Sequence, residues 1–515
     1  MVGDTNKRYK ITSNASRSPS CPFPGGGFTS IILGPTADNM CDLFNSFLEA
    51  ELEFVIKMDD VFSVLPSTTE QKPAFANCNN PSFVIGFDDS MKAIKSYQLQ
   101  ANGQVIYTQN ENMYEASIVA AGATQTCRKQ DVYGTMIHED VWNNVDTVRT
   151  GVLLTADKFD ANKECKIKIP IKIDMRRFLP LSWIKYIPLF AGNLELRICF
   201  SGEGLVCAPL PIDDVLQVPA KMSKLAEHLP ITNRFVQVGM PFTMVTGVTF
   251  ASNVYTMTTA KQTVHVKNMM VKSCYSHLAN FGLDPVVYDE LVSTYTQESL
   301  SIPTRTLVFS QMSGSVGEPT CNLLQSMVPR FVEAIYLMFP KTPDHKTVFE
   351  NPLFNNVSFK MGGYGLITDE AFATPSPMFY ALAQNSMNTN NDIIGFNDDI
   401  MRSLTANREL LYDASKGAYT DLGFKSCDTT HFFMGFPTET DNTFQQGQTS
   451  NSPITYHFRG SLEPGNYYLK SQADGGCTAG AVIGLLKDSV FAIQVRGDGS
   501  PPIITLDEYD LTTPE

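Results

Sequence analysis

Hydrophobic and polar side chains alternate along several short segments of the chain, the pattern of half-buried β-strands. The clearest case runs from Lys166 to Ile173, where isoleucine occupies every second position and lysine or proline lies between. Alternation of this kind puts the isoleucines on one face of a strand and the lysines on the other. Pro170 falls on the lysine side. Because proline cannot donate to a strand ladder, we expect an edge strand or a bulge here.

Other apolar or alternating runs, bounded by turn residues, predict further strands. They are the segments 28–33, 52–58, 82–87, 193–200, 264–267, 306–309, 331–339, 481–486 and 490–495. Between residues 97 and 107, two β-prone runs flank Asn102-Gly103. This dipeptide predicts a hairpin with a type I′ turn, because both central residues of that turn need a positive φ. The uncharged run 235–260 contains Pro241 and several threonines, and so predicts β structure rather than a membrane span.

Helical patterns are few and short, at 289–296 and at 378–385, and the polar region 340–460 is expected to form long loops. Many short strands with few helices are typical of sandwiches and barrels. The sequence therefore predicts an all-β protein.

Composition divides the chain into four parts. Residues 1–26 are expected to form a flexible N-terminal arm, with Lys7, Arg8, Lys10 and Arg17 against Asp4. Such an arm is either a disordered terminus or a segment that orders against a neighbouring subunit.

A proline-punctuated stretch at 208–219 is the best candidate linker. It separates a first half, 27–215, from a second half, 216–500, and each is large enough for one eight-stranded jelly roll with insertions. Residues 501–515 form an acidic C-terminal tail, either a frayed end or a segment that docks on a basic partner.

Charge and cysteine content narrow the possible functions. Charged residues make up 18% of the 515 residues, below the usual ~25% of a soluble domain. The net charge is −14 and no long basic run is present, so we do not expect specific nucleic-acid binding. The 11 cysteines have no recurring spacing, which favours scattered buried thiols over a disulfide framework. The N-terminus has no apolar core, and we expect no signal peptide.

Candidate chemistry is weak throughout. His138-Glu139-Asp140 places a base beside two carboxylates, but Trp142 stands where a second histidine of a zinc motif would be. The acidic pairs are expected to be solvated turns, although some could meet lysine or arginine across subunit contacts; they lie at 59–60, 88–89, 213–214 and 398–399. The glycine clusters at 362–365 and 475–476 lack a phosphate-binding frame. We therefore predict no catalytic, cofactor-binding or metal site, and no enzyme.

Several segments resemble one family of viral shell proteins. They are 42–48 leading into 52–58, 83–87 with 93–97, 102–110 with Tyr114-Glu115, 177–188 with 192–200, and in the second half 432–436 with 444–447. These strand patterns are similar to the double jelly-roll (hexon-like) major capsid proteins of the polinton-like virus and virophage lineage. The resemblance covers mainly residues 28–205.

The resemblance implies two tandem eight-stranded jelly rolls with long loop insertions and few short helices. It also implies a structural protein that forms homotrimeric, pseudo-hexameric capsomers of an icosahedral virion, assembled inside the host cell. Neighbouring capsomers, penton proteins and minor capsid proteins would be its partners, without a membrane span. The alternatives from other classes are a β-sandwich carbohydrate-binding or attachment protein and a β-sandwich hydrolase. The chain has only two tryptophans for stacking on sugars, which argues against both alternatives.

Overall fold

The computed structural model describes most of the strand-forming parts of the chain. These are residues 10–15, 27–34, 40–59, 82–87, 89–123, 152–155, 158–209, 236–251, 254–316, 320–328, 331–340, 347, 349, 356–362, 364–371, 408–413, 418–424, 433–437, 453–461, 481–497 and 500–508. Every structural statement below concerns these residues.

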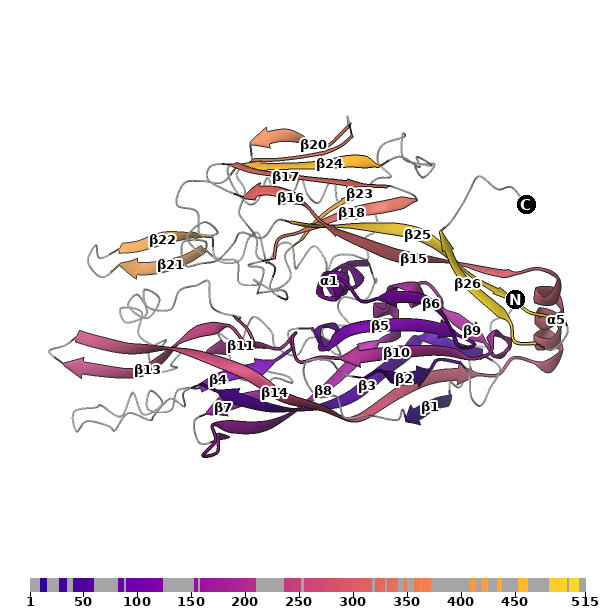
Figure 1. The fold of residues 1–515 in the computed structure, drawn as a ribbon, viewed down its shortest axis with the longest axis horizontal. Helices are drawn as coiled ribbons and strands as arrows, with labels where there is room; N and C mark the ends of the chain where they lie inside the picture. The colour runs from indigo at the N-terminus through magenta and orange to yellow at the C-terminus, as the bar shows by residue number, and fades with distance from the viewer. Residues whose placement is uncertain are drawn as a thin grey trace.

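Eight strands from the first part of the chain form two antiparallel sheets that share one core (Figure 1). They are β1 (Lys10–Ala15), β2 (Thr29–Ile32), β3 (Met40–Met58), β5 (Ile94–Ala101), β6 (Gln104–Gln109), β8 (Glu164–Asp174), β10 (Leu194–Phe200) and β14 (Val254–Phe281). The β3 sheet has the order β1-β14-β3-β8, and the β5 sheet has the order β2-β10-β5-β6. Numbered one to eight along the chain, the orders are 1-8-3-6 and 2-7-4-5, which is jelly-roll connectivity. We call this unit the first sandwich.

Eight later strands repeat this connectivity. They are β15 (Leu300–Gln311), β17 (Thr320–Met327), β18 (Val332–Met338), β19 (Asn356–Met361), β20 (Tyr364–Ala371), β23 (Phe433–Pro437), β24 (Ile454–Ser461) and β25 (Val482–Gln494). The β25 sheet has the order β15-β25-β18-β23, and the β24 sheet contains β17-β24-β19-β20. These are again 1-8-3-6 and 2-7-4-5. The second sandwich therefore duplicates the first in topology, and the expectation of two eight-stranded jelly rolls is confirmed.

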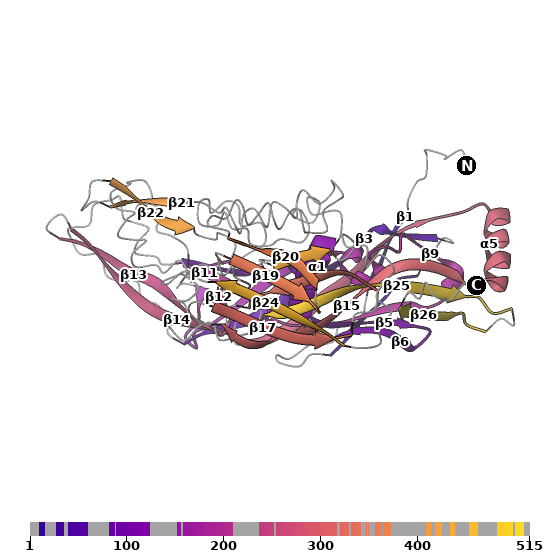
Figure 2. The ribbon, with the colours of Figure 1, turned by 90° about the horizontal axis from the view of Figure 1, so that it is seen from above.

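The remaining described elements extend this frame. They are β4 (Ser82–Gly86), β7 (Val152–Thr155), β9 (Tyr186–Pro188), β11 (Val206–Pro209), β12 (Val236–Gln237), β13 (Pro241–Ala251), β16 (Ser313–Val316), β21 (Arg408–Asp413), β22 (Ala418–Phe424), β26 (Ile503–Glu508) and the helices α1 (Met113–Ala123) and α5 (Pro285–Gln297). Helix α5 joins β14 to β15 at one end of the long axis, and the β13–β14 hairpin lies at the other end (Figures 1 and 2). Neither described helix has the length and apolar character of a membrane-crossing segment.

The strand pairing departs from the expected domain boundary at 215/216. Strand β14 lies beyond that boundary, yet it pairs with β1 and with β3 of the first sandwich. The start of the proline-rich stretch forms the end of β11, which pairs with β4 and β12. The described start of this stretch, Ala208 and Pro209, therefore precedes β14, the last strand of the first sandwich. Part of the expected flexible arm, residues 10–15, is strand β1.

The predicted hairpin and strands are confirmed where the sequence has a clear turn dipeptide or a clear hydrophobic pattern. The β5–β6 hairpin turns at Asn102 and Gly103, whose φ values are 49° and 85°, so the predicted turn is confirmed. Strand β8 is the edge of its sheet, and Ile167, Ile169 and Ile171 are buried, as the alternation predicts. The uncharged run 235–260 forms strands, also as predicted.

Helix α5 confirms the helix expected at 289–296, whereas the one expected at 378–385 lies outside the described residues. The prediction of long loops throughout 340–460 is wrong, because β19 to β24 fall in this region. Strand β19 alternates polar and apolar residues, but it is only six residues long and stands in an otherwise polar region.

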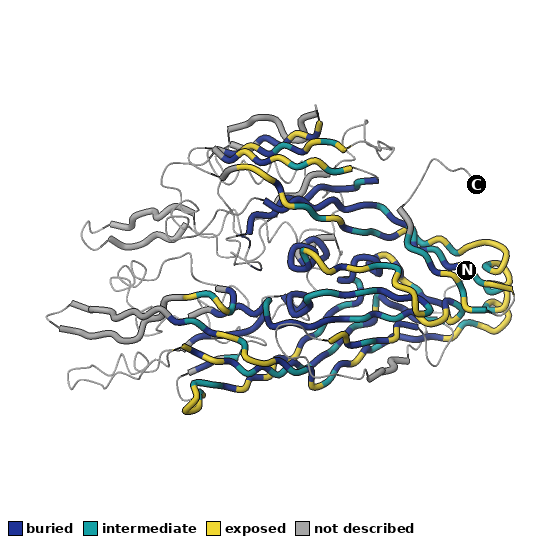
Figure 3. Tube along the Cα trace, viewed as in Figure 1, coloured by how far each residue is buried: buried dark blue, intermediate teal, exposed yellow. Residues whose placement is uncertain are grey.

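The two sandwiches pack side by side, and buried residues run through both (Figure 3). The first core includes Phe54, Leu99 and Ile198, from both sheets of the first sandwich, and the second includes Leu337 and Phe458. Exposed positions gather around α5, none of whose residues is buried (Figure 3). Burial is therefore concentrated within the two sandwiches, and α5 at the end of the molecule is exposed.

Candidate functional site

Of the acidic residues singled out in the sequence, the structure describes Asp59, which is exposed beside His265, and Asp89, which is buried beside Arg177. His138, Glu139 and Asp140 lie outside the described residues, as do the acidic pairs at 213–214 and 398–399. The part of the chain that the structure describes contains no group of three or more metal-binding side chains. The polar feature that the structure does build is a buried contact between the two sandwiches.

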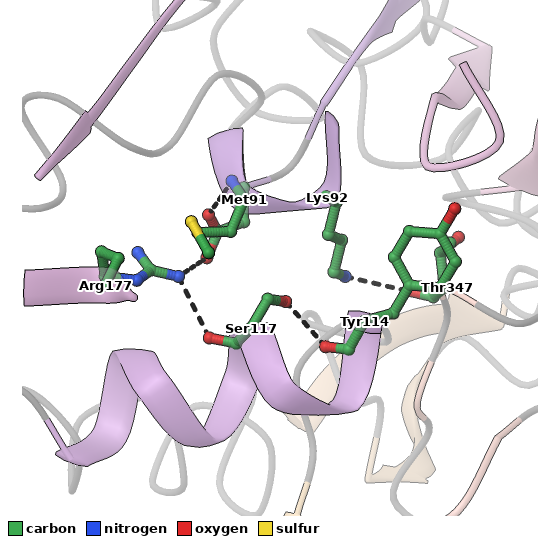
Figure 4. Close-up of polar contacts among 7 residues, drawn as sticks. Met91, Lys92, Tyr114, Ser117, Arg177 and Thr347 are labelled. Atoms are coloured by element: carbon green, nitrogen blue, oxygen red, sulfur yellow. Dashed lines mark hydrogen bonds and ion pairs between the residues drawn. The ribbon is translucent and has the colours of Figure 1, made fainter. Parts of the chain in front are cut away.

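This contact begins with an ion pair inside the first sandwich (Figure 4). The Arg177 guanidinium lies 2.5 Å from the Asp89 carboxylate and also donates to the Ser117 carbonyl at 3.1 Å. The same carboxylate accepts from the Met91 backbone N–H at 2.8 Å, which caps the short 3₁₀ helix at Ser90–Ala93. Both charged side chains are less than 10% exposed. Asp89 was expected in a solvated turn, and that expectation is wrong because Arg177 neutralises it in the interior.

The next residue of that 3₁₀ helix crosses to the second sandwich. Lys92 is fully buried, and its ammonium donates to the Thr347 carbonyl at 2.8 Å (Figure 4). It also lies 5.9 Å from the centre of the Phe349 ring. Thr347 and Phe349 belong to the connection between β18 and β19 and are themselves buried. A cation of the first sandwich thus holds a loop of the second.

A second polar contact lies along β15. Thr304 donates to the Pro180 carbonyl at 2.7 Å, across the two sandwiches. The neighbouring Arg305 stacks on the Trp183 ring at 4.2 Å and pairs with Glu333 of β18. Stacking of guanidinium on indole is among the stronger cation–π arrangements. Arg305 therefore links a strand pair of the second sandwich to a surface aromatic of the first.

A third contact ties the hairpin turn to the last described strand. Asn102 donates to the Pro502 carbonyl at 2.8 Å and accepts from the Asn193 backbone N–H at 3.1 Å. Gly192 allows this close approach, since a Cβ there would lie 2.9 Å from the Asn102 side-chain oxygen. The three polar contacts together, with the residues named above, are called the junction from here on.

The apolar residues at the junction belong to both units. Phe491 and Ile493 of β25, with Ile504 of β26, pack into the first core. In the other direction, Tyr114 and Val119 of α1 pack into the second. Each core is completed by the other sandwich, so the two units are fixed against each other by apolar burial as well as by polar contacts.

Titratable groups near these cores are held in their neutral forms. Burial raises the pKa of the Cys41, Cys207 and Cys321 thiols to about 12. Burial also raises the pKa of Tyr97 and Tyr107 above the ordinary tyrosine value. A nucleophilic thiol needs a lowered pKa instead. These three thiols are therefore suited to packing in the two cores rather than to acting as nucleophiles.

Sequence reasoning did not single out Lys92, Arg177 or Arg305. The sequence did offer one signal for Lys92. In the segment Ser90–Tyr97, Lys92 and Lys95 are the two charged residues, and the rest of the segment is uncharged. Partners 60 to 255 positions apart, such as Lys92 and Thr347, could not be paired from one sequence.

Comparisons with known proteins give structural matches only. No family model matches the chain, and no curated protein matches it. The chain is similar to the mavirus major capsid protein at 9% identity, over 100% of this chain and 94% of that one, with a TM-score of 0.48. For the Sputnik virophage structure the values are 10%, 100% and 92%, with a TM-score of 0.46. For a PBCV-1 protein fitted into a reconstruction of Sputnik they are 9%, 98% and 98%, with a TM-score of 0.44.

Proposed function

We propose that this chain is the major capsid protein of an icosahedral virus and forms homotrimeric, pseudo-hexameric capsomers. Three copies of a chain with two upright jelly rolls present six similar lobes around a threefold axis. Such a ring closes by cyclic symmetry, the usual solution for soluble homo-oligomers. A tile with six similar sides can then meet six neighbours in a shell.

The observation that carries the proposal is the repeated 1-8-3-6 and 2-7-4-5 connectivity of the two sandwiches. A pseudo-hexameric capsomer needs two equivalent sandwiches per chain, which we call wall units, and their relative orientation must be fixed more rigidly than a flexible linker allows. The junction supplies that stiffness through Lys92, Arg305 and the shared cores. We place the first wall unit at residues 10–281 and the second at 300–508, with α5 between them.

The proposed role is mechanical and needs no catalytic group. The buried, paired charges of the junction and the neutral thiols support this role. Neighbouring capsomers, with penton and minor capsid proteins, are the proposed partners, and the virion is the proposed location. The low charged fraction of 18% suits a surface that is largely covered in an assembly.

Light scattering and imaging of the purified full chain test this proposal. We expect a particle of about 171 kDa, three times the 56.9 kDa of one chain, with a six-lobed outline. A species that stays at the mass of one chain at high protein concentration, and binds glycans, would overturn the proposal in favour of an attachment protein.

A further inference from the structure

The outer face of the β24 sheet carries a cluster of basic side chains that we call the basic face. It consists of His457 and Arg459 on β24 and Lys360 on β19, where Lys360 stands directly opposite His457 in the strand register. The Arg459 Nε lies 3.1 Å from the His457 Nε2. Lys360 and Arg459 are exposed, as is the neighbouring Leu324 of β17. Two exposed cations, Lys360 and Arg459, thus lie beside the half-buried His457, whose ring also contacts the Asn322 side-chain oxygen.

Nothing in the described part of the chain neutralises the basic face. Neither Lys360 nor Arg459 takes part in any ion pair among the described residues. Partial burial, with these two cations nearby, lowers the pKa of His457. Like charges on neighbouring strands are unfavourable. An anionic partner would relieve that repulsion.

The β3 sheet shows how the same chain arranges charges on a face that needs no partner. Its outer surface pairs Lys168 with Glu51 at 3.0 Å and Lys272 with Glu53 at 3.1 Å. His277 lies 3.1 Å from Glu49 on the same surface. Cations and carboxylates alternate across the strands there. Among the side chains that the structure describes, the basic face lacks this alternation, so we regard it as the open half of a contact.

The chain itself contains a suitable anionic segment. From residue 507 to 515 it carries four acidic side chains and no basic one: Asp507, Glu508, Asp510 and Glu515. The first two residues of this stretch, Asp507 and Glu508, end β26, which pairs with β25 in the opposite layer of the second sandwich from the basic face. To dock on its own basic face the segment would have to wrap around the sandwich, whereas another copy meets no such obstacle.

We propose that the acidic segment 507–515 of one copy docks on the basic face of a second copy. The contact pairs its carboxylates with Lys360 and Arg459, and Leu324, which stands opposite His457 on β17, offers an exposed apolar position beside these charges. The proposal rests on the proposed function, because it supplies a tie between copies in a shell. A tie of exposed charges is reversible and sensitive to salt, since solvent ions screen it.

Charge exchange tests the contact in the full-length protein. The face variant is Lys360→Glu with Arg459→Glu, and the segment variant is Asp510→Lys with Glu515→Lys. We expect each variant to weaken association between capsomers about tenfold at low salt. Mixing the two variants should restore association, because the lysine segment of one fits the glutamate face of the other. Analytical ultracentrifugation against protein concentration, at low and high salt, measures this.

A matched control changes the net charge equally at another place. Lys158→Glu with Arg496→Glu alters two exposed basic residues outside the basic face, and should leave association unchanged. If this control weakens association as much as the face variant, net charge is the cause and the docking proposal fails. It also fails if one chain carrying both sets of exchanges recovers while the mixture does not, because the segment then docks within its own chain.

The capsomer mass separates this proposal from the function on which it rests. Capsomers of normal mass whose association none of the exchanges alters would refute the docking contact and leave the capsid role in place. A purified wild-type chain that forms no capsomer at all would refute the capsid role first.

Discussion

At the scale of single residues, the charges of this protein fall into two groups with different energetic weight. Arg177 and Asp89 are paired in the interior, whereas Lys168 and Glu51 are paired on an open sheet surface. Removing one partner of a buried pair leaves an uncompensated charge away from water. Removing one partner of an exposed pair leaves a charge that water solvates.

Arg177→Met is therefore expected to destabilise the fold by about 3–5 kcal/mol. The matched change on the open surface, Lys168→Met, should cost about 0.2–1 kcal/mol. Urea unfolding of both variants, followed by circular dichroism, measures the difference. Equal, small losses for the two variants would mean that Asp89 is reached by water and that the ion pair does not matter.

The buried thiols predict a reactivity pattern. Because burial raises the pKa of Cys41, Cys207 and Cys321 to about 12, almost no thiolate is present at pH 8. We expect iodoacetamide to leave these three unmodified in the native protein and to label them in urea. Peptide mapping by mass spectrometry measures this. Rapid native labelling of Cys207 would contradict its placement in the first core.

His457 predicts a local response to pH. Its pKa is lowered by partial burial and by Arg459 and Lys360, so the folded state resists protonation there. The unfolded chain binds that proton more readily, and this site therefore reduces stability as the pH falls below the ordinary histidine value. We expect Arg459→Gln to raise the pKa of His457 toward that value, as measured by NMR titration. Lys158→Gln is the control and should leave the titration unchanged.

At the scale of elements, strands were predictable where one side of the sheet is apolar and the other charged. Strand β8 shows this, because its isoleucines face the core while its lysines meet glutamates of β3. Strand β19 was missed although Asn356–Met361 alternates polar and apolar residues, because this six-residue run stands within the long polar region 340–460. Strand β1 was also missed, because its polar sequence relies on pairing with β14, a partner more than 250 residues away.

The loop between β10 and β11 packs closely against the 3₁₀ helix that carries Lys92. Gly204, between β10 and β11, lies so near the 3₁₀ helix at Ser90–Ala93 that a Cβ would stand 2.0 Å from the Lys92 carbonyl oxygen. Gly204→Ala should force the helix backbone to move and cost about 1–3 kcal/mol. Gly497→Ala is the control, since its Cβ would make an ordinary contact at 3.5 Å with Thr296. Thermal unfolding compares them, and similar melting temperatures would contradict the close approach.

At the scale of the whole molecule, the two sandwiches should unfold together. Phe491 of the second sandwich is buried in the core of the first. Phe491→Ala should therefore cost about 3–5 kcal/mol and loosen both units at once. Hydrogen exchange followed through peptides of β3 and of β18 measures this. Faster exchange in β18 alone would mean that the sandwiches are independent domains.

The junction itself could not be predicted from the sequence. Fold class followed from alternation and turn residues, which are local properties of the chain. The junction depends on contacts such as Thr304 with Pro180, whose partners are 124 positions apart. The difference between the expected boundary and the strand pairing has the same cause, because proline content is local, whereas membership of a sheet depends on a distant partner such as β3 for β14.

Strand β25 has a consequence for biosynthesis. It pairs along its length with β15, and its second half places Phe491 and Ile493 in the first core. A ribosome elongating at about 5–20 residues per second must therefore add more than 200 residues after β14 before that core can close. During this interval, nascent chains would expose apolar residues of the first core, the kind of surface that chaperones protect from aggregation. Fragments released early would keep that apolar surface exposed and would be prone to aggregate.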